Sequence, residues 1–394
     1  MTNREIFYRN MGLPSSSPLG IEIEKAEGIY IYDKTGKEYI DLVSGVSVSN
    51  VGHRHPKVVA AIKDQLSKYM HLMVYGEYIQ SPQVQLAKML TEHLPENLNS
   101  VYFVNSGSEA IEGAMKLAKR YTGRTEMIAF KNAYHGGTQG ALSVLGNESL
   151  KFAFRPLLPD IEFLEFNKTA DLDKISKKTA CVIAETIQAE AGIILPENDF
   201  LKKLKQRCNE TGVLLIIDDI QMGFGRTGKL FSFENFDFIP DILTLAKGMG
   251  GGMPIGAFIS SKEIMNTLTF EPELGHITTF GGHPVSCASA IANLNIIIDE
   301  RLPEKASESG KLYVEALKNH PKIKEIRQTG LMLGIDLEDS KSTDKLVSNF
   351  IKYGLISDRF LFRPQSFRIA PPLIISKTEI EKSLELINRS LEDL

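Results

Sequence analysis

The stretch LLIIDDIQMGFGRTG, residues 214–228, joins an apolar segment to two aspartates and a run of glycines. Residues 214–217 are suited to a buried β-strand, yet Asp218 and Asp219 follow them directly. A buried carboxylate without a partner costs several kcal/mol, so two aspartates at this place need an explanation. Either the strand has ended and a solvated turn begins, or a carboxylate there serves a ligand.

Apolar runs recur on both sides of this stretch and alternate with amphipathic helices. Helices are expected over residues 108–121 and 198–210, and strands over the runs 100–104, 127–130, 181–185, 213–218, 242–246 and 255–259. Strands that alternate with helices predict a mostly parallel sheet with helices on both faces. The fold class is therefore α/β, with a large central sheet domain.

The two ends of the chain have a different pattern. Residues 28–42 alternate around a Thr-Gly-Lys turn, which predicts a β-hairpin, and residues after 295 predict helices with two or three shorter strands. We expect a smaller α/β domain built from both ends. The predicted division is an N-terminal segment, 1–50, that joins the small domain, a large domain, 51–290, and a C-terminal part of the small domain, 291–394.

Composition excludes several classes of partner. The 394 residues have a formal charge of −4, and Lys and Arg are scattered, so nucleic acid and membrane surfaces are not expected to bind. Cys181, Cys208 and Cys287 form no CxxC pattern or Cys/His cluster, so we expect reduced thiols and no metal site. The first residues lack the apolar region of a signal peptide, and we expect a cytoplasmic protein.

Polar residues follow four of the predicted strands. Residues 105–108, Glu185, Asp218 and Lys247 each come at or just after the end of an apolar run. Ligands of open α/β sheets bind outside the carboxyl ends of the strands. These side chains are therefore expected to meet at one edge of the sheet.

Residues 105–108 begin a predicted helix. Gly107 permits close approach of the backbone, and the free N–H groups of the first helical turn, together with the helix dipole, form an anion site suited to phosphate. The simpler alternative is an ordinary helix cap at Ser106 or Ser108. The stretch is neither a Walker A loop nor a G-x-G-x-x-G motif.

Lys247 follows an apolar strand and precedes a glycine-rich turn. A lysine at a strand end commonly extends into solvent, but a desolvated lysine has a lowered pKa and attacks aldehydes. A pyridine cofactor with a phosphate group needs such a lysine, an anion site and a carboxylate that keeps its ring nitrogen protonated. Asp218 is suited to the last role, and Asp219 is then expected to turn away into hydrogen bonds or solvent.

The sequence resembles the class III pyridoxal-phosphate aminotransferases, the group of acetylornithine, ornithine and other ω-amino-acid transaminases. The resemblance extends from about residue 18 to residue 390. It rests on eight stretches, which are residues 28–56, 105–124, 133–144, 185–192, 214–236, 240–257, 278–288 and 367–373. The lysine motif AKGMGGG and the run DDIQMGFGRTG are the most specific of them. The resemblance implies fold type I and the cofactor pyridoxal 5'-phosphate.

The resemblance also implies roles for residues of the cofactor site. Lys247 matches the lysine that holds the cofactor's aldehyde and moves a proton, and Asp218 matches the partner of the ring nitrogen. Gln221 matches a donor to the cofactor's phenolic oxygen. Ile220 and Tyr134 match the residues that pack on opposite faces of the ring.

Further matches concern the phosphate, the partner subunit and the substrate. Gly107 and Ser108 match the phosphate cradle. Thr279 matches a threonine that reaches the phosphate in the neighbouring subunit, which implies a homodimer with shared sites. Arg368 matches the arginine that binds the α-carboxylate of 2-oxoglutarate or glutamate, and Glu185 matches the acid that pairs with this arginine when an ω-amine enters. His135 is expected to be a scaffold residue that makes hydrogen bonds.

The chain departs from the family pattern at several positions. Gly137 stands where acetylornithine and ornithine transaminases have an arginine that holds a substrate carboxylate, so we expect an amine donor other than N-acetylornithine. Arg155 or Arg363 is the alternative source of that contact. The other departures are the loop ETIQAEAG, 185–192, the second acid of DDIQ, and the stretch SDRFLFRPQS, 357–366.

The sequence thus predicts a transaminase that moves an amino group from an ω-amino acid or related amine to 2-oxoglutarate or pyruvate in a ping-pong cycle. One alternative is an aminomutase of the glutamate-1-semialdehyde type, which moves the amine within one molecule. Another is a catalytically silent protein that binds the cofactor. A dinucleotide oxidoreductase is disfavoured because the glycine runs do not fit its fingerprint.

Overall fold

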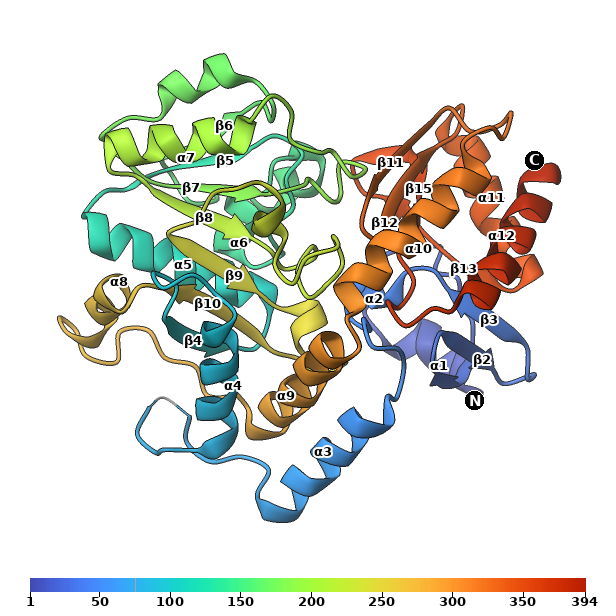
Figure 1. The fold of residues 1–394 in the computed structure, drawn as a ribbon, viewed down its shortest axis with the longest axis horizontal. Helices are drawn as coiled ribbons and strands as arrows, with labels where there is room; N and C mark the ends of the chain where they lie inside the picture. The colour runs from blue at the N-terminus through green and yellow to red at the C-terminus, as the bar shows by residue number, and fades with distance from the viewer. Residues whose placement is uncertain (75) are drawn as a thin grey trace.

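The computed structural model describes residues 1–74 and 76–394, which form two lobes (Figure 1). The larger lobe is built on a seven-stranded sheet in the order β4-β10-β9-β8-β7-β5-β6, and the smaller lobe contains two four-stranded sheets. The seven strands are β4 (Ser100–Val104), β5 (Glu126–Phe130), β6 (Ile161–Leu164), β7 (Thr179–Glu185), β8 (Leu214–Asp218), β9 (Ile242–Leu245) and β10 (Gly256–Ser260).

The seven-stranded sheet is mostly parallel, as the sequence predicts. The pairs β5–β6, β5–β7, β7–β8 and β8–β9 are parallel, and only β10 pairs antiparallel with its neighbours β4 and β9. Both faces of the sheet are covered, which explains why its strands are continuous apolar runs. Ile216 of β8 packs in the core on the side of α5 (Gly107–Thr122), whereas Leu215 and Ile217 pack in the core on the side of α7 (Phe200–Thr211).

The smaller lobe joins the two ends of the chain. Strand β13 (Leu355–Ile356) pairs in parallel with β3 (Glu38–Asp41), the last strand of the N-terminal sheet with β1 (Ile23–Glu27) and β2 (Tyr30–Asp33). The predicted hairpin is the antiparallel pair β2–β3. The second sheet contains β11 (Glu325–Thr329), β12 (Met332–Asp336), β15 (Arg363–Ile369) and β14 (Arg359–Phe360). The lobe also contains the helices α10 (Leu302–Leu317), α11 (Ser340–Tyr353) and α12 (Lys377–Glu392).

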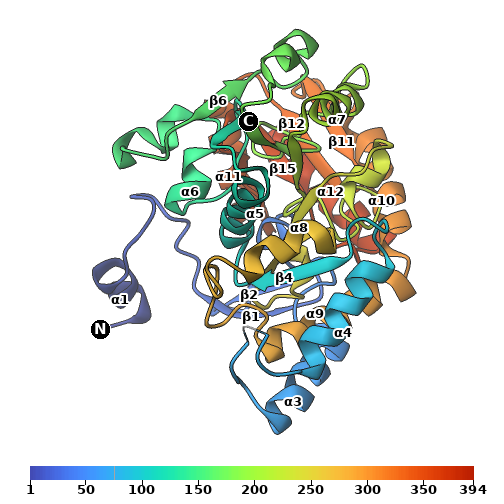
Figure 2. The ribbon, with the colours of Figure 1, turned by 90° about the vertical axis from the view of Figure 1, so that its left-hand side faces the viewer.

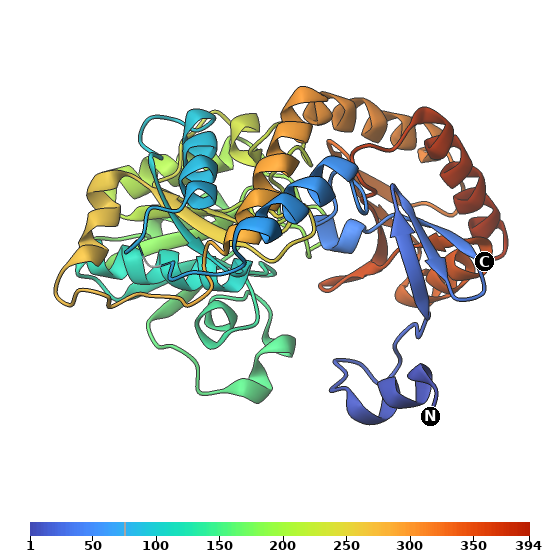
Figure 3. The same cartoon turned by 90° about the horizontal axis from the view of Figure 1, so that it is seen from below.

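Helix α9 (Pro284–Asp299) connects the lobes and packs against α3 (Pro56–Lys68) and α4 (Ser81–Glu92). The division into residues 1–50, 51–290 and 291–394 stays a proposal, and its second boundary falls inside α9. Helix α1 (Asn3–Asn10) lies apart from the main body (Figures 2 and 3). The remaining α-helices are the short α2 (Ser44–Ser47), α6 (Gln139–Ser143) and α8 (Lys262–Asn266). Within the described ranges, no helix is long and apolar enough to cross a bilayer.

Arg226 lies in the turn after β8 and is wholly buried between the lobes. Its guanidinium donates hydrogen bonds to the carbonyl oxygens of Leu331 and Pro371, at 2.9 and 2.7 Å, and to Oδ1 of Asn50, at 2.8 Å. Because these acceptors come from distant parts of the sequence, one side chain connects the turn of the central sheet to both ends of the chain.

Candidate active site

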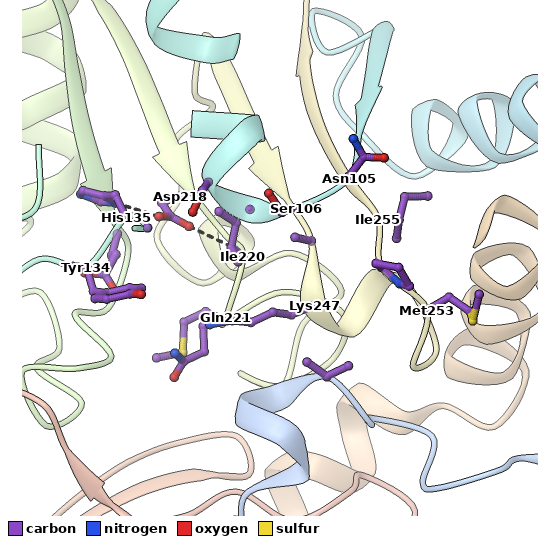
Figure 4. Close-up of a pocket in the computed structure, with 18 of the residues that line it drawn as sticks. Asn105, Ser106, Tyr134, His135, Asp218, Ile220, Gln221, Lys247, Met253 and Ile255 are labelled. Carbon is purple, nitrogen blue, oxygen red and sulfur yellow. Dashed lines mark hydrogen bonds and ion pairs between the residues drawn. The ribbon is translucent and has the colours of Figure 1, made fainter. Parts of the chain in front are cut away.

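The polar residues at the strand ends surround one cavity of about 430 Å³ (Figure 4). Eight of the ten predicted site residues line this cavity, namely Gly107, Ser108, Tyr134, Glu185, Asp218, Ile220, Gln221 and Lys247. The structure therefore brings together the side chains that the strand-edge argument predicts to meet. The other two, Thr279 and Arg368, are not in its lining, although Arg368 contacts Gln221.

Lys247 follows β9 in a left-handed backbone conformation, with φ of 43°. A non-glycine residue in this region is strained, and such strain is concentrated at functional sites. Burial lowers the pKa of Lys247, and the charges of Glu190 and Asp218 only partly oppose this effect. The side chain therefore combines a fixed position with an amine that loses its proton more readily than an exposed lysine.

Asp218 is held on both oxygens. Oδ1 accepts a hydrogen bond from the backbone N–H of Ile220, at 3.0 Å, and Oδ2 accepts one from Nδ1 of His135, at 2.7 Å (Figure 4). Burial opposes protonation of His135, but its bond to Asp218 and the charge of that residue outweigh burial and raise its pKa. His135 is thus a hydrogen-bonding residue, as expected, and its partner is the predicted cofactor ligand.

Asp219 turns away from the cavity, but it does not reach solvent. It is fully buried, and its Oδ2 accepts a hydrogen bond from the backbone N–H of Ser232, at 3.0 Å. Burial raises the pKa of Asp219 to about 7. The two adjacent aspartates therefore have separate surroundings, and only Asp218 faces the cavity.

The N-terminus of α5 forms a close-packed cradle. A Cβ atom added to Gly107 would stand 2.9 Å from Cδ1 of Ile220, and one added to Gly136 would stand 2.1 Å from Oγ of Ser108. Oγ of Ser108 accepts a hydrogen bond from the backbone N–H of Gly137, at 3.2 Å. Glycines thus let two segments of backbone approach the helix end, as an anion site requires.

Arg368, on β15, is buried and pairs with Glu190, not with Glu185. Its Nη2 lies 2.9 Å from Oε1 of Glu190, and its Nη1 donates to Oε1 of Gln221, at 3.1 Å. The prediction that Glu185 pairs with Arg368 is therefore wrong. Glu185 is the last residue of β7, whereas Glu190 lies in the loop that follows, and only Glu190 contacts Arg368.

Glu185 instead stabilises the backbone beside the cavity. Its Oε2 accepts a hydrogen bond from the N–H of Tyr134, at 3.2 Å, and its Oε1 accepts one from the N–H of Ala189, at 3.0 Å. Burial raises the pKa of Glu185 to about 8, and the charge of His135 opposes this rise. The carboxyl group is thus a buried structural acceptor at the edge of the cavity.

A second cavity, of about 290 Å³, adjoins the first and shares Tyr134 and Gly136 with it. Its lining also includes Gly137 and the apolar residues Leu142, Leu145, Leu150 and Phe154. A Cβ atom added to Gly137 would meet nothing within 4 Å. Gly137, where the family resemblance implies an arginine, therefore borders open space beside an apolar wall.

The two arginines considered as substitutes have other partners. Arg155 is half exposed and pairs with Glu148, at 2.6 Å, and Arg363 pairs with Asp336 and Glu325, at 2.5 and 3.0 Å. In the part of the chain that the structure describes, neither of the two cavities is lined by an arginine.

Thr279 lies on the surface, outside the cavity. Its carbonyl oxygen accepts a hydrogen bond from Nε2 of His71, at 2.8 Å, and the rings of His71 and Phe280 are 4.9 Å apart. Close in sequence to these residues, Met70, Leu72, Ile277 and Phe280 have large exposed apolar side chains.

The residues present fit pyridoxal phosphate. One cavity combines the backbone N–H groups at the start of α5, the amine of Lys247 and the carboxylate of Asp218. These are the groups required by the phosphate, the aldehyde and the ring nitrogen. Gly107 and Gly136 line this cavity beside the start of α5, and both are packed too closely against Ile220 and Ser108 to carry a side chain.

Comparison with known proteins identifies the family. The family profile described as aminotransferase class-III matches residues 12–391. The chain belongs to the class-III aminotransferases. Among its relatives, the acetylornithine aminotransferase of Methanopyrus kandleri is 40% identical over 366 residues, which cover 92% of each chain.

Two further class-III aminotransferases show the range of the family. A [LysW]-aminoadipate semialdehyde/glutamate semialdehyde transaminase of Sulfolobus acidocaldarius is 39% identical and covers 81% of this chain and 82% of its own. The structure of the ornithine aminotransferase from Toxoplasma gondii, described with partial occupancy of PLP at its active site, superposes with a TM-score of 0.91 at 29% identity. That alignment covers 99% of this chain and 94% of the other.

The class-III aminotransferase described here is therefore an enzyme of fold type I, and its cofactor is pyridoxal 5'-phosphate. It moves an amino group between an amine and an oxo acid. Sequence reasoning missed the contact of Glu190 with Arg368. The sequence offered no signal for this contact, because Glu190 lies in an irregular bend after β7 that is closed by the bridge between Gln188 and Ile194.

Proposed function

We propose that this enzyme transfers the ω-amino group of a donor with an uncharged distal part to 2-oxoglutarate or pyruvate, in a ping-pong cycle. The observation that supports the chemistry is the convergence of Lys247, Asp218 and the α5 N-terminus on one cavity. When bound, pyridoxal phosphate supplies an aldehyde that condenses with amines and a ring that withdraws electrons.

The chain's own residues have distinct tasks in this proposal. Lys247 would hold the cofactor through its aldehyde and, as the base, would move a proton between the amine-bearing carbon of the substrate and the aldehyde carbon of the cofactor. Asp218, fixed by His135 and the N–H of Ile220, keeps the ring nitrogen protonated. The first turn of α5 binds the phosphate.

Other residues orient the ring and the substrate. Tyr134 and Ile220 would pack against the cofactor ring. The amide nitrogen of Gln221, which donates to Oε1 of Glu190 at 3.2 Å in this structure, would donate to the phenolic oxygen of the cofactor. Arg368 binds the carboxylate of the oxo acid, and Glu190 neutralises this arginine while an ω-amine occupies the site, because the two charges are 2.9 Å apart.

Reduction with borohydride tests the role of Lys247. Reduction of the cofactor-loaded enzyme, followed by peptide mapping, should label Lys247. Lys151 is an internal control because it is also buried with a pKa lowered by burial, yet it donates to the carbonyl oxygen of Leu145 and lies outside both cavities. Labelling of Lys151, or of any lysine other than Lys247, would contradict the proposal. Turnover that requires an added oxo acid would exclude the aminomutase alternative.

The proposed donor follows from the second cavity. Open space at Gly137 and an apolar wall favour a neutral or apolar distal group over a carboxylate, because a carboxylate left there without a cationic partner is costly. The relatives named acetylornithine aminotransferases, at 36–40% identity, make N-acetylornithine the second candidate donor.

Substitution of Gly137 distinguishes the two donors. Gly137→Arg should raise kcat/KM for N-acetylornithine by about a hundredfold or more, since it supplies the missing partner for the carboxylate. Gly137→Met adds similar bulk without charge and should not have this effect. If the unmodified enzyme already uses N-acetylornithine with kcat/KM above roughly 10⁴ M⁻¹s⁻¹, the proposed donor class is wrong.

We also infer a cytoplasmic homodimer in which Thr279 of one subunit contributes to the cofactor site of the other. The inference is supported by the exposed position of Thr279, which contacts His71, and by the exposed apolar side chains of Met70, Leu72, Ile277 and Phe280. Free, buried cysteines at 181, 208 and 287 suit a reducing compartment. A fully active monomer in sedimentation and assay experiments would refute the shared site, and mixed dimers of Lys247→Ala and Thr279→Ala chains should differ in activity from both parents.

A further inference from the structure

Arg368 is paired with a second acid, Asp358, in addition to Glu190. Nε of Arg368 lies 3.0 Å from Oδ1 of Asp358, an ion-pair distance without the alignment of a hydrogen bond. Glu190 and Gln221 contact the terminal nitrogens, and the guanidinium carbon lies 4.6 Å from the centre of the Phe360 ring. All three nitrogens of the guanidinium therefore have an acceptor nearby.

The position of Asp358 is fixed by the backbone. Its carbonyl oxygen accepts a hydrogen bond from the N–H of Arg368, at 3.0 Å, and Oγ of Ser357 donates to the carbonyl oxygen of Arg368, at 2.6 Å. Asp358 and Phe360 both belong to the stretch 357–366, in which this chain departs from the family pattern. The second acid is thus tied to the strand that carries the arginine.

Glu190 and Asp358 contact different sides of the guanidinium. Glu190 contacts a terminal nitrogen of the guanidinium, where it competes with a substrate carboxylate. Asp358 contacts Nε, which a carboxylate bound to the two terminal nitrogens does not use. Displacement of Glu190 by a substrate therefore leaves Asp358 in place. With both acids ionised the resting cluster has one positive and two negative charges. A substrate carboxylate that displaces Glu190 from the guanidinium adds a third negative charge to the site, because Glu190 belongs to the same chain and stays nearby.

We propose that Asp358 is a specificity-determining residue that lowers the affinity of Arg368 for substrate carboxylates. The excess negative charge penalises any oxo acid or amino acid that places a carboxylate on Arg368. An amine donor that leaves the Glu190–Arg368 pair intact is not penalised. This inference rests on the proposed function of Arg368. It adds that the enzyme favours amine donors that place no carboxylate on Arg368, and that it binds its oxo-acid acceptor less tightly as a result.

The test compares Asp358→Asn with the unmodified holoenzyme. Asparagine keeps the shape of the side chain and an oxygen that faces Nε, but removes the charge. The probe is glutarate, a five-carbon dicarboxylate without a reactive carbonyl or amine, titrated by calorimetry. We expect Asp358→Asn to lower the Kd for glutarate roughly tenfold, equivalent to about 1.4 kcal/mol. The rate of the first half-reaction with a primary monoamine, followed by cofactor absorbance, should change less than about twofold, since the charge of Asp358 does not act on such a donor.

A matched control removes an acid from the same lobe. Asp344 pairs with Arg359 at 2.7 Å on the surface, and Asp344→Asn should leave the Kd for glutarate within about twofold, because exposed pairs contribute little. Asp358→Ala is the second variant if the asparagine variant does not fold.

An unchanged or higher Kd in both Asp358 variants, or no glutarate binding in any of the proteins, would overturn the proposal. A higher Kd would mean that Asp358 positions Arg368 and does not weaken it. Failure of the proposed function is a separate result, because it appears in the unmodified enzyme as absence of any amine half-reaction.

Discussion

Replacing Glu185 by glutamine should change how the stability of the protein depends on pH. Burial raises the pKa of Glu185 to about 8, from an ordinary value of 4.5. A carboxyl group whose pKa is raised on folding stabilises the folded chain fully below the unfolded pKa, and this contribution is lost as pH rises through the folded pKa. The unmodified protein should therefore lose stability between about pH 4.5 and pH 8 through this group.

The size of the effect follows from the same two pKa values. The gap between 4.5 and about 8 corresponds to roughly 4–5 kcal/mol at most, and relaxation of the pocket should reduce this to roughly 2–4 kcal/mol. Glutamine cannot ionise, but it offers one acceptor where Glu185 offers two, to the N–H groups of Tyr134 and Ala189. The lost acceptor should cost about 1–2 kcal/mol at every pH. The variant should thus be less stable than the parent near pH 5 and more stable near pH 9.

Thermal unfolding of the two proteins, followed by circular dichroism from pH 5 to pH 9, measures the difference. For a chain of this length, Tm changes by about 1 °C per kcal/mol, so the two curves of Tm against pH should cross and diverge by a few degrees. The control is Glu304→Gln, which replaces an exposed acid paired with Arg301. Its curve of Tm against pH should be parallel to that of the parent. Parallel curves for Glu185→Gln would refute the argument that burial of this carboxyl opposes its ionisation.

Two further pairs of substitutions test the cofactor site. Asp218→Asn should lower kcat for transamination by several orders of magnitude, because the ring nitrogen loses its acidic partner. Asp219→Asn should have a mild effect on kcat, because the carboxylate of Asp219 faces the N–H of Ser232. The reverse ranking in single-turnover assays would disprove the assignment. Gly136→Ala should raise the Kd for pyridoxal phosphate by at least about tenfold, because the added Cβ would stand 2.1 Å from Oγ of Ser108. Gly137→Ala is the control and should leave that Kd unchanged, because open space surrounds the position. A fluorescence titration measures both values.

Much of the fold could be predicted because the pattern that specifies it is local. Each strand of the central sheet is an apolar run covered on both faces, and α5 and α7 have buried residues at helical spacing. The meeting of Asp218 and Lys247 followed from topology alone, since β8 and β9 are parallel neighbours whose carboxyl ends lie together.

The contacts of Arg368 could not be predicted, because they depend on loop direction and on long-range pairing. Glu185 ends a strand, and its carboxyl returns to nearby backbone, while Glu190 lies in a bend closed by the bridge between Gln188 and Ile194. Asp358 reaches Arg368 only because residues 359–360 pair with β15. Neither arrangement has a periodicity that a sequence displays.

The buried guanidinium of Arg226 has a consequence for how the protein is made. Burial lowers its pKa to about 9, so the group needs its acceptors if it is to remain charged in the interior. One acceptor, the carbonyl of Pro371, is close to the end of the chain. During synthesis, the turn after β8 therefore emerges from the ribosome long before its last partner does. The cofactor strand should reach its final geometry only after residue 371 has left the ribosome, and a nascent chain stalled before residue 371 should be unable to retain pyridoxal phosphate.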